Sequence, residues 1–486
     1  MNARWPALPG LVAAAWLLGG GCSTEPPAGA LVLTQTPPFA GTNRAATLLD
    51  ARYPAGSRVV LLLPPYRTHD VRLLSKGLLA AGDPVVAPDG RTVFFAGRRD
   101  AASDWQIYQA RLNGGAPRRV TAMPGGALNP TVMAGGDVVF ASPVPPADQP
   151  WTASRPAALY AQQPGAAPRR LTFTPHSALE PTVLADGRIL FVTVQPGAAG
   201  PDGPRLGLFT VNNDGTELTA FAGQHDGGWP VLRRPRELDR ARVAFLAAEQ
   251  HTAAELTRTE AVRLARPQRS RAPLLPGVNG ACRAVEPGEP GEWLACLEPR
   301  GLAGRGHPDT FGVYRVRADA AEAVTLLFDD PAWHEVEALR LAPRAWPQGH
   351  ISAMTPECAS GTVLCLNVNE TSYTSGPATN PAVRVRLAQW TNAGEQVLGE
   401  LKPHADGSFM VELPADVPLV IEALDATGAV VRRCPPLVWV RSGENRACVG
   451  CHEPHNYAPR NVRPLAANLP PATLFPPGPA LAGKQP

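Results

Sequence analysis

The sequence predicts an all-β protein: a six-bladed β-propeller, with seven blades as the alternative count, followed by a small β-sandwich. Three observations support this prediction. Proline accounts for 55 of the 486 residues and charged residues for 18%, a composition that disfavours long helices. A pattern of short apolar strands repeats about every 50 residues in the first part of the chain. Alternating apolar residues then follow a proline-rich stretch.

The repeat runs through residues 31–342, which we assign to the propeller. In its three clearest copies an apolar strand follows a hairpin-type turn, at Asp89-Gly90, Gly136-Asp137 and Asp186-Gly187. A four-stranded unit of this kind cannot bury both faces alone, so such repeats close into a ring. The stretch 87–95 also resembles the TolB-like propeller repeat. A degenerate first copy of the repeat at 59–63 brings the predicted number of blades to six.

Residues 343–361 form a proline-rich linker, and residues 362–441 read as strands separated by turns. Alternation is clearest at Val383, Val385 and Leu387, where the intervening arginines would face water. With several such strands and no helix signal, a β-sandwich is the expected closure.

The segment 442–460 contains the motif Cys448-Val449-Gly450-Cys451-His452, the attachment pattern of a c-type haem. Each thiol adds to one vinyl group of the porphyrin, and the histidine binds the iron. The alternatives are a redox disulfide, half of a zinc site, or chance. A zinc site needs a second ligand pair, and no other CxxC occurs. We therefore predict one haem c on Cys448 and Cys451, with His452 as the axial ligand.

The first 22 residues predict a targeting segment, with Arg4 before an apolar core and small residues before Cys22. A cysteine there resembles the lipobox of bacterial lipoproteins, although Gly19 stands where leucine is usual. An ordinary signal peptide is the alternative. We expect lipidation at Cys22, a tether at 23–30, and a lipid-anchored protein that faces the periplasm from the outer membrane.

The remaining cysteines are expected to pair where the compartment is oxidising. Cys282 with Cys296 and Cys358 with Cys365 are the candidate disulfides. Cys434 is then the odd thiol, and both packing and a ligand role stay open for it.

The formal net charge of +3 predicts neither a nucleic-acid partner nor a basic membrane-binding surface. No internal apolar run approaches the roughly 20 residues of a membrane-spanning helix. Residues 461–486 form a proline-rich tail.

The order of parts, with the segments 406–419, 439–444 and 448–453, resembles the α subunit of hydrazine synthase and its relatives. The resemblance implies a propeller and a haem-bearing middle domain, and it is most specific at 406–453. The sequence shows no further haem region after this motif, so a single haem is expected. In that subunit a tyrosine shortly after the motif binds the iron and the motif histidine is left for zinc, which makes Tyr457 the rival of His452.

Three functions remain open. The first is electron transfer to a redox partner protein within a larger complex. The second is a haem enzyme acting on a small nitrogen or oxygen species, and the third is a propeller scaffold for a protein partner. The distal iron ligand is also open, and the candidates are Met354, Met410, His350, His404 and His455.

Overall fold

The computed structural model of the chain describes residues 28–38, 53–144, 156–163, 165–200, 203–223, 231–248, 258–275, 281–298, 306–307, 310–317, 324–372, 376–451 and 461–474. Within these ranges every regular element is a strand or a short 3-10 helix, so the all-β prediction is confirmed. No helix in the described part is long and apolar enough to cross a membrane.

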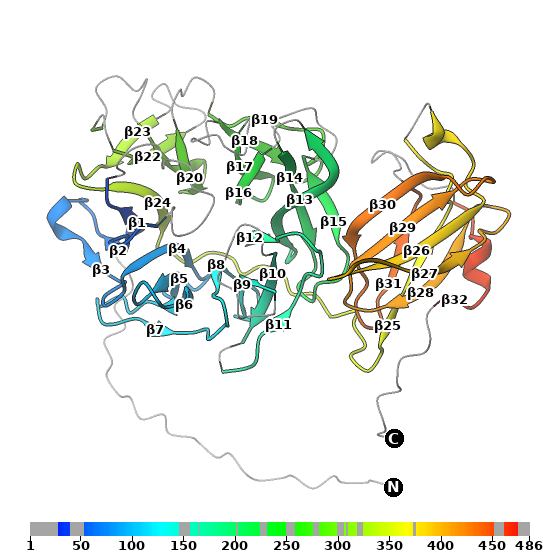
Figure 1. Cartoon of the computed structure of the whole chain (residues 1–486). Coiled ribbons are helices and arrows are strands. Elements are labelled where there is room, and N and C mark those ends of the chain that lie inside the picture. Colours follow the sequence, from blue (N-terminus) through cyan, green and yellow to red (C-terminus); the bar gives the residue numbers. More distant parts are fainter. Residues whose placement is uncertain are drawn as a thin grey trace, which may run out of the picture.

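In the described part of the chain, twenty-four strands between Leu31 and Arg340 form six four-stranded sheets (Figure 1). The first strands of successive sheets contact one another around a closed circle, which makes this part of the chain a β-propeller. In sheet order the strands are β24 (His334–Arg340), β1 (Leu31–Thr36), β2 (Arg58–Leu62) and β3 (Arg72–Leu73); β4 (Ala80–Val86), β5 (Val93–Arg98), β6 (Gln106–Gln109) and β7 (Arg118–Arg119); β8 (Leu128–Val132), β9 (Val138–Pro143), β10 (Ala157–Gln162) and β11 (Arg169–Arg170); β12 (Leu179–Val183), β13 (Ile189–Gly200), β14 (Gly203–Val211) and β15 (Thr219–Ala222); β16 (Val231–Asp239), β17 (Arg242–Ala248), β18 (Arg258–Arg263) and β19 (Ala272–Pro273); β20 (Cys282–Pro287), β21 (Glu292–Leu297), β22 (Gly312–Arg317) and β23 (Val324–Phe328).

One blade combines both ends of the propeller sequence. Its innermost strand, β24, pairs antiparallel with β1, with Leu31 opposite Arg340. The Thr34 hydroxyl donates to the Glu337 carboxylate across this pair at 2.5 Å. The ring is therefore closed by hydrogen bonds between segments about 300 residues apart in sequence.

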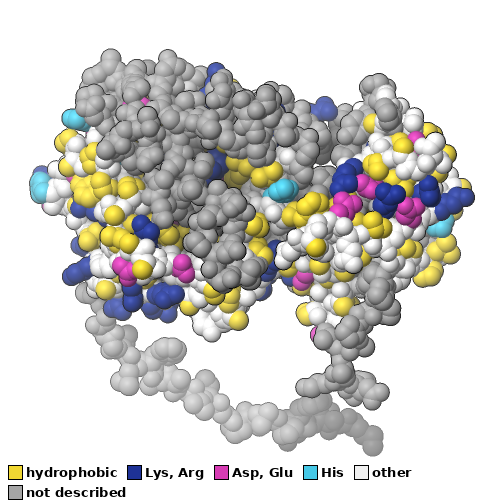
Figure 2. Space-filling model, viewed as in Figure 1, with side chains coloured by type: hydrophobic (Ala, Val, Ile, Leu, Met, Phe, Trp, Pro, Cys, Tyr) yellow, Lys and Arg dark blue, Asp and Glu magenta, His cyan; other side chains and the backbone are white. Residues whose placement is uncertain are grey.

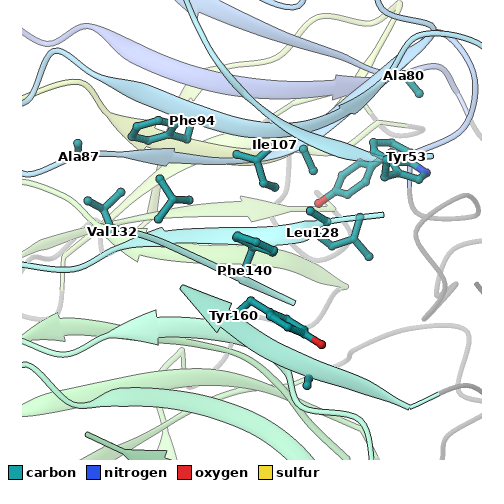
Figure 3. Packing of buried hydrophobic residues seen from close by; sticks show 14 of the residues in the cluster. Tyr53, Ala80, Ala87, Phe94, Ile107, Leu128, Val132, Phe140 and Tyr160 are labelled. Carbon is teal, nitrogen blue, oxygen red and sulfur yellow. The ribbon is translucent and has the colours of Figure 1, made fainter. Parts of the chain in front are cut away.

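Apolar side chains between blades form the cores of the propeller (Figure 3). Phe94 and Ile107 of one blade pack with Leu128, Phe140 and Tyr160 of the next. The Phe140 and Tyr160 rings stack with centroids 6.2 Å apart. Each blade thus buries its faces against its neighbours, as a repeat that is not stable alone requires.

Polar side chains fill the centre of the ring. Tyr53 donates its hydroxyl to Asp83 at 2.8 Å and to Glu337 at 2.6 Å, although one hydroxyl proton serves only one of them at a time. Arg233 binds both carboxylate oxygens of Glu180, at 2.7 and 3.1 Å. The Tyr53–Asp83 and Arg233–Glu180 contacts each cross from one blade to another, so they join blades around the axis.

The linker lies against the propeller at two of its glycine turns. The Arg344 amide donates to the Pro88 carbonyl at 3.0 Å, and the Gln348 amide donates to the Ala185 carbonyl at 2.9 Å. A Cβ atom on Gly90 would lie 2.2 Å from the Pro343 nitrogen, and one on Gly187 would lie 2.2 Å from the Gln348 oxygen. The hairpin glycines therefore also leave room for the linker.

Two further four-stranded sheets among the described residues form the sandwich. The short helices η3 (Pro377–Thr379) and η4 (Leu465–Asn468) belong to this domain, and η2 (Thr68–Asp70) belongs to the propeller. The sheets share one core, in which Val363 and Phe409 pack with Val385 and Ile421. In sheet order the strands are β31 (Asn445–Cys448), β25 (Ser360–Cys365), β28 (Phe409–Pro414) and β32 (Ala472–Thr473); β27 (Gly394–Leu401), β26 (Arg384–Thr391), β29 (Leu419–Leu424) and β30 (Val430–Val438). Because β31 and β32 belong to the first sheet, the predicted boundary at residue 441 falls inside the sandwich.

The sandwich also has an exposed ladder of charges, and Figure 2 shows its basic and acidic side chains side by side. Arg386 lies between Glu400 and Glu422, and Arg433 pairs with Glu422 and Glu395. The exposed Arg386–Glu400 pair contributes about 0 to 1 kcal/mol, whereas Glu422 is only 4% exposed and is paired with two arginines.

Candidate functional site

The CxxC motif begins at the last residue of the edge strand β31. This strand pairs in parallel with β25, and the register places Val363 beside Arg446 and Cys365 beside Cys448. The first thiol of the motif therefore belongs to a sheet of the sandwich. Cys365 is 2% exposed, whereas Cys448 is partly exposed.

After Cys448 the chain follows a turn made by Asn367 to Glu370. The Leu366 amide donates to the Cys448 carbonyl at 2.9 Å, and the Asn367 amide donates to the Val449 carbonyl at 3.1 Å. The Cys451 amide then donates to the Glu370 carbonyl at 2.9 Å. Three backbone hydrogen bonds thus fix the path of the motif from one cysteine to the other.

Gly450 is required by a close approach of two backbone segments. A Cβ atom at this position would lie 2.4 Å from the Glu370 carbonyl oxygen and 2.6 Å from the Glu370 Cβ. The motif suggests one reason for glycine at position 450, which is that a side chain would crowd a bound porphyrin. The structure adds a second reason, which is that a side chain would collide with the supporting turn.

The supporting turn is itself held by a buried arginine. Arg432 is 3% exposed and donates to the Asn369 side-chain oxygen at 2.9 Å and to the Ala378 carbonyl at 2.7 Å. The Ala382 amide donates to the same Asn369 oxygen at 2.7 Å. From the sequence Arg432 reads as a strand-end charge; its burial behind the turn has no sequence signal.

The other end of the motif strand is anchored in the propeller. Trp439, which follows β30, lies 1% exposed in a propeller cluster with Leu171 and Phe173. Its indole nitrogen donates to the Gly215 carbonyl at 3.0 Å. Arg441 donates to the Asp214 carbonyl at 2.5 Å. The sandwich therefore docks on the propeller through residues that immediately precede the motif.

Glu444 links the two domains just before β31. Its carboxylate accepts hydrogen bonds from the Glu217 amide at 2.9 Å and from the Arg441 amide at 2.7 Å. Burial raises the pKa of Glu444 above its ordinary value, and these two hydrogen bonds oppose the rise. Arg446, two residues before Cys448, donates to the Leu218 carbonyl.

Three cysteines pack at the edge of the sandwich core. Cys448, Cys451 and Cys434 are all partly buried and contact the same cluster that contains Cys365. Among the described residues no group of three or more His, Cys, Asp and Glu side chains is placed to hold a metal ion. Proximity to this core favours the packing interpretation of Cys434.

Several predicted residues lie outside the described ranges: Cys22, His452, His455 and Tyr457. Of the other distal-ligand candidates, His404 starts a turn that adjoins the Asn367 turn, since the Val368 amide donates to the Gly407 carbonyl at 2.9 Å. His350 instead contacts the Asp186 carbonyl on the propeller. Met410 is opposite Leu364 in the ladder.

The structure forms neither of the expected disulfides. Cys282 packs in one inter-blade cluster and Cys296 in another, so their thiols occupy opposite faces of the blade. Cys365 ends the extended strand β25, which begins at Ser360, after Cys358. Five steps of about 3.3 Å already separate the ends of this strand by about 17 Å, beyond the reach of a disulfide.

Burial makes the two propeller thiols unreactive. It raises the pKa of Cys282 to about 11 and that of Cys296 well above its usual value. Only the thiolate is nucleophilic, so these cysteines stay protonated and inert at neutral pH.

Comparison with known proteins identifies the middle of this site. Residues 362–453 match the family model described as the hydrazine synthase alpha subunit middle domain. The matched segment starts in β25 and ends just beyond the CxxC motif. A comparison with curated protein sequences finds no match.

The fold also matches a solved structure over most of its length. Hydrazine synthase from Kuenenia stuttgartiensis aligns with a TM-score of 0.75 at 18% identity, covering 90% of this chain and 71% of that chain. TolB from Acinetobacter baumannii aligns with a TM-score of 0.40 at 10% identity, covering 60% of this chain and 61% of that chain. The second match is too distant to support an inference, and the first shows a shared fold. The resemblance to the hydrazine synthase α subunit is therefore confirmed.

Proposed function

We propose that this chain holds one haem c through Cys448 and Cys451 and passes electrons to a partner protein within a larger complex. The main supporting observation is a CxxC segment with partly exposed thiols on a backbone path fixed by three hydrogen bonds. A bound haem supplies one-electron transfer. The sandwich edge supplies the two sulfur atoms and a rigid support.

The residues fit the attachment step. Both thiols are at the rim of the sandwich core rather than inside it, and Gly450 is already accommodated against Glu370. His452 follows the second thiol directly and is our proposed axial ligand, with Tyr457 as the rival. The His452→Ala and Tyr457→Phe variants distinguish them, because only loss of the true ligand shifts the Soret band.

Absorption spectra of the purified protein, oxidised and reduced, test the proposal. We expect a haem band that survives denaturing electrophoresis and a low-spin, six-coordinate iron. A denatured protein without covalent haem would refute the attachment. A high-spin, five-coordinate iron would refute simple electron transfer.

The second candidate is a haem enzyme acting on a small nitrogen or oxygen species. The match of residues 362–453 to the hydrazine synthase middle domain favours it. Turnover of such a species by the haem-loaded protein, lost on removal of either thiol, would support this candidate over electron transfer.

We also propose a cell-envelope location with a lipid anchor at Cys22, on the lipobox-like sequence before it. The Cys22→Ala variant is expected to move from the membrane to the soluble periplasmic fraction. A variant that still sediments with membranes at high salt would refute the anchor. We further propose that the six described sheets are the complete set of blades.

A further inference from the structure

Cys365 lies directly beside the first cysteine of the motif. The two residues face each other in the parallel ladder of β25 and β31. Neighbouring strands are about 4.8 Å apart. Disulfides join Cα atoms about 4.4 to 6.8 Å apart, so this spacing suits one. The hydrogen bond from the Leu366 amide to the Cys448 carbonyl, 2.9 Å, holds the two strands together at this point.

Both side chains are on the inner face of the sheet. Burial along β25 alternates, with Gly361, Val363 and Cys365 facing the core. Residues opposite each other in a ladder point to the same face, so Cys448 points the same way as Cys365. Their common packing with the sandwich core agrees with this orientation.

The other cysteines of the sandwich are less well placed to react with Cys448. Cys434 is opposite Ile421 in the second sheet, and packed sheets are about 10 Å apart. Cys451 is held on the far side of the turn by its hydrogen bond to Glu370. Residues 449–451 are bends, so a Cys448–Cys451 link is the competing outcome that the mapping experiment below separates.

We propose that Cys365 and Cys448 form a disulfide before the haem is attached, and that Cys365 controls whether Cys448 is available for its thioether bond. The disulfide follows from the ladder register alone. Its effect on haem attachment rests on the proposed function, because a sulfur in a disulfide cannot add to a vinyl group.

The reaction is thiol–disulfide exchange with an external disulfide such as oxidised glutathione. The Cys448 thiol is partly exposed, so an external disulfide reaches it first, and its thiolate form makes the attack. One glutathione leaves as a thiol and a mixed disulfide remains. The Cys365 sulfur then attacks the Cys448 sulfur beside it, and its proton goes to the departing second glutathione. This buried thiol differs from those of the propeller because its partner is held next to it in the ladder. Two cysteine thiols are oxidised, and one external disulfide is reduced to two thiols.

The test uses the full-length chain produced without haem and treated with oxidised glutathione. Free thiols are blocked with iodoacetamide, and an unreduced digest is analysed by mass spectrometry. We expect a peptide that joins Cys365 to Cys448. In the Cys365→Ala variant the reaction should stop at the mixed disulfide, so the digest should contain a Cys448 peptide that carries glutathione in place of the joined peptide. The Cys358→Ala variant is the control and should behave like the parent.

A Cys448–Cys451 or Cys448–Cys434 link, or no link to Cys448, would overturn the proposal. The mapping of the parent chain needs no variant, so a Cys365→Ala protein that fails to fold does not prevent a result. The haem-dependent part is tested separately, by adding haem and a reductant to the oxidised chain. If the joined peptide is found but no covalent haem forms after reduction, the proposed function fails while the disulfide stands.

Discussion

Cys296 and Cys448 both lie on β-strands, but the two domains present them very differently. Cys296 is 1% exposed between two propeller blades, and burial holds its pKa well above the usual range. Cys448 ends an edge strand at the rim of the sandwich core and is partly exposed. The contrast shows that position within the sheet, and not residue type or β-structure, separates an inert thiol from one that can be modified.

The domains differ in their construction for the same reason. In the propeller every blade lies between two others, so a central cysteine has no route to solvent. The sandwich has one core and exposed edges, and β31 occupies one of them. An edge strand leaves such a group open to solvent, which suits the haem attachment proposed above.

The largest expected effect comes from removing the exposed thiols. In Cys448→Ala and Cys451→Ala, covalent haem should be lost or held by one thioether, because each thiol makes one bond. Cys296→Ala should keep its full haem content. A haem-stained denaturing gel makes the comparison, and equal bands in all three variants would end the proposed distinction.

Trp439 tests whether the sandwich depends on the propeller. Trp439→Ala should lower the free energy of unfolding by about 3 to 5 kcal/mol, since a large side chain leaves a propeller cluster. Trp439→Phe should cost less, losing mainly the hydrogen bond to Gly215, worth about 1 kcal/mol. Chemical denaturation measures both. Equal costs for the two variants would contradict this account of the docking contact.

The buried thiols predict a pH dependence. The pKa of Cys282 is raised by burial from 9.0 to about 11, so the folded state keeps a proton that the unfolded state releases. Stability from this group is full below pH 9 and is lost as the pH rises toward 11. The loss should reach about 2 kcal/mol at pH 11. The contribution of Cys282 is isolated by measuring the unfolding free energy of the parent and of the Cys282→Ala variant across this pH range and taking the difference. A difference that does not change with pH would contradict the raised pKa of Cys282.

Gly450→Ala should lower stability less than Trp439→Ala does. The new methyl group meets the Glu370 carbonyl, and relieving such overpacking costs about 1 to 3 kcal/mol. We expect a matching fall in haem loading, because the loop between the thiols must move. Gly349→Ala, whose Cβ would meet nothing within 4 Å, is the control. If the two variants load haem equally, the turn does not position the motif.

Local patterns made the blades predictable. A turn such as Asp89-Gly90 and the apolar strand after it are neighbours in sequence, so the repeat can be read directly. The pairing of β24 with β1 has no such signal, because its partners are far apart in the chain. The same holds for Arg432 behind the motif turn and for Trp439 in the propeller.

The cysteine pairs show a second limit. Cys282 and Cys296 are close enough in sequence to suggest a hairpin disulfide, but a bulge between Cys282 and Ala284 shifts the register. A one-residue shift changes the face on which a side chain emerges. The partner of Cys448 in the ladder, Cys365, is 83 positions away, so spacing alone could not indicate it.

The pairing of β24 with β1 also has a consequence for the order in which the protein folds. During synthesis β1 to β3 emerge first but lack their innermost strand until residue 340 has been made. Contacts over such a separation form slowly, and their unpaired edges are open to misassembly in the meantime. The sandwich sequence and the CxxC motif follow β24 in the chain. Residues 214–218 of the propeller contact the segment that precedes the CxxC motif. They are therefore synthesised long before the motif that docks beside them.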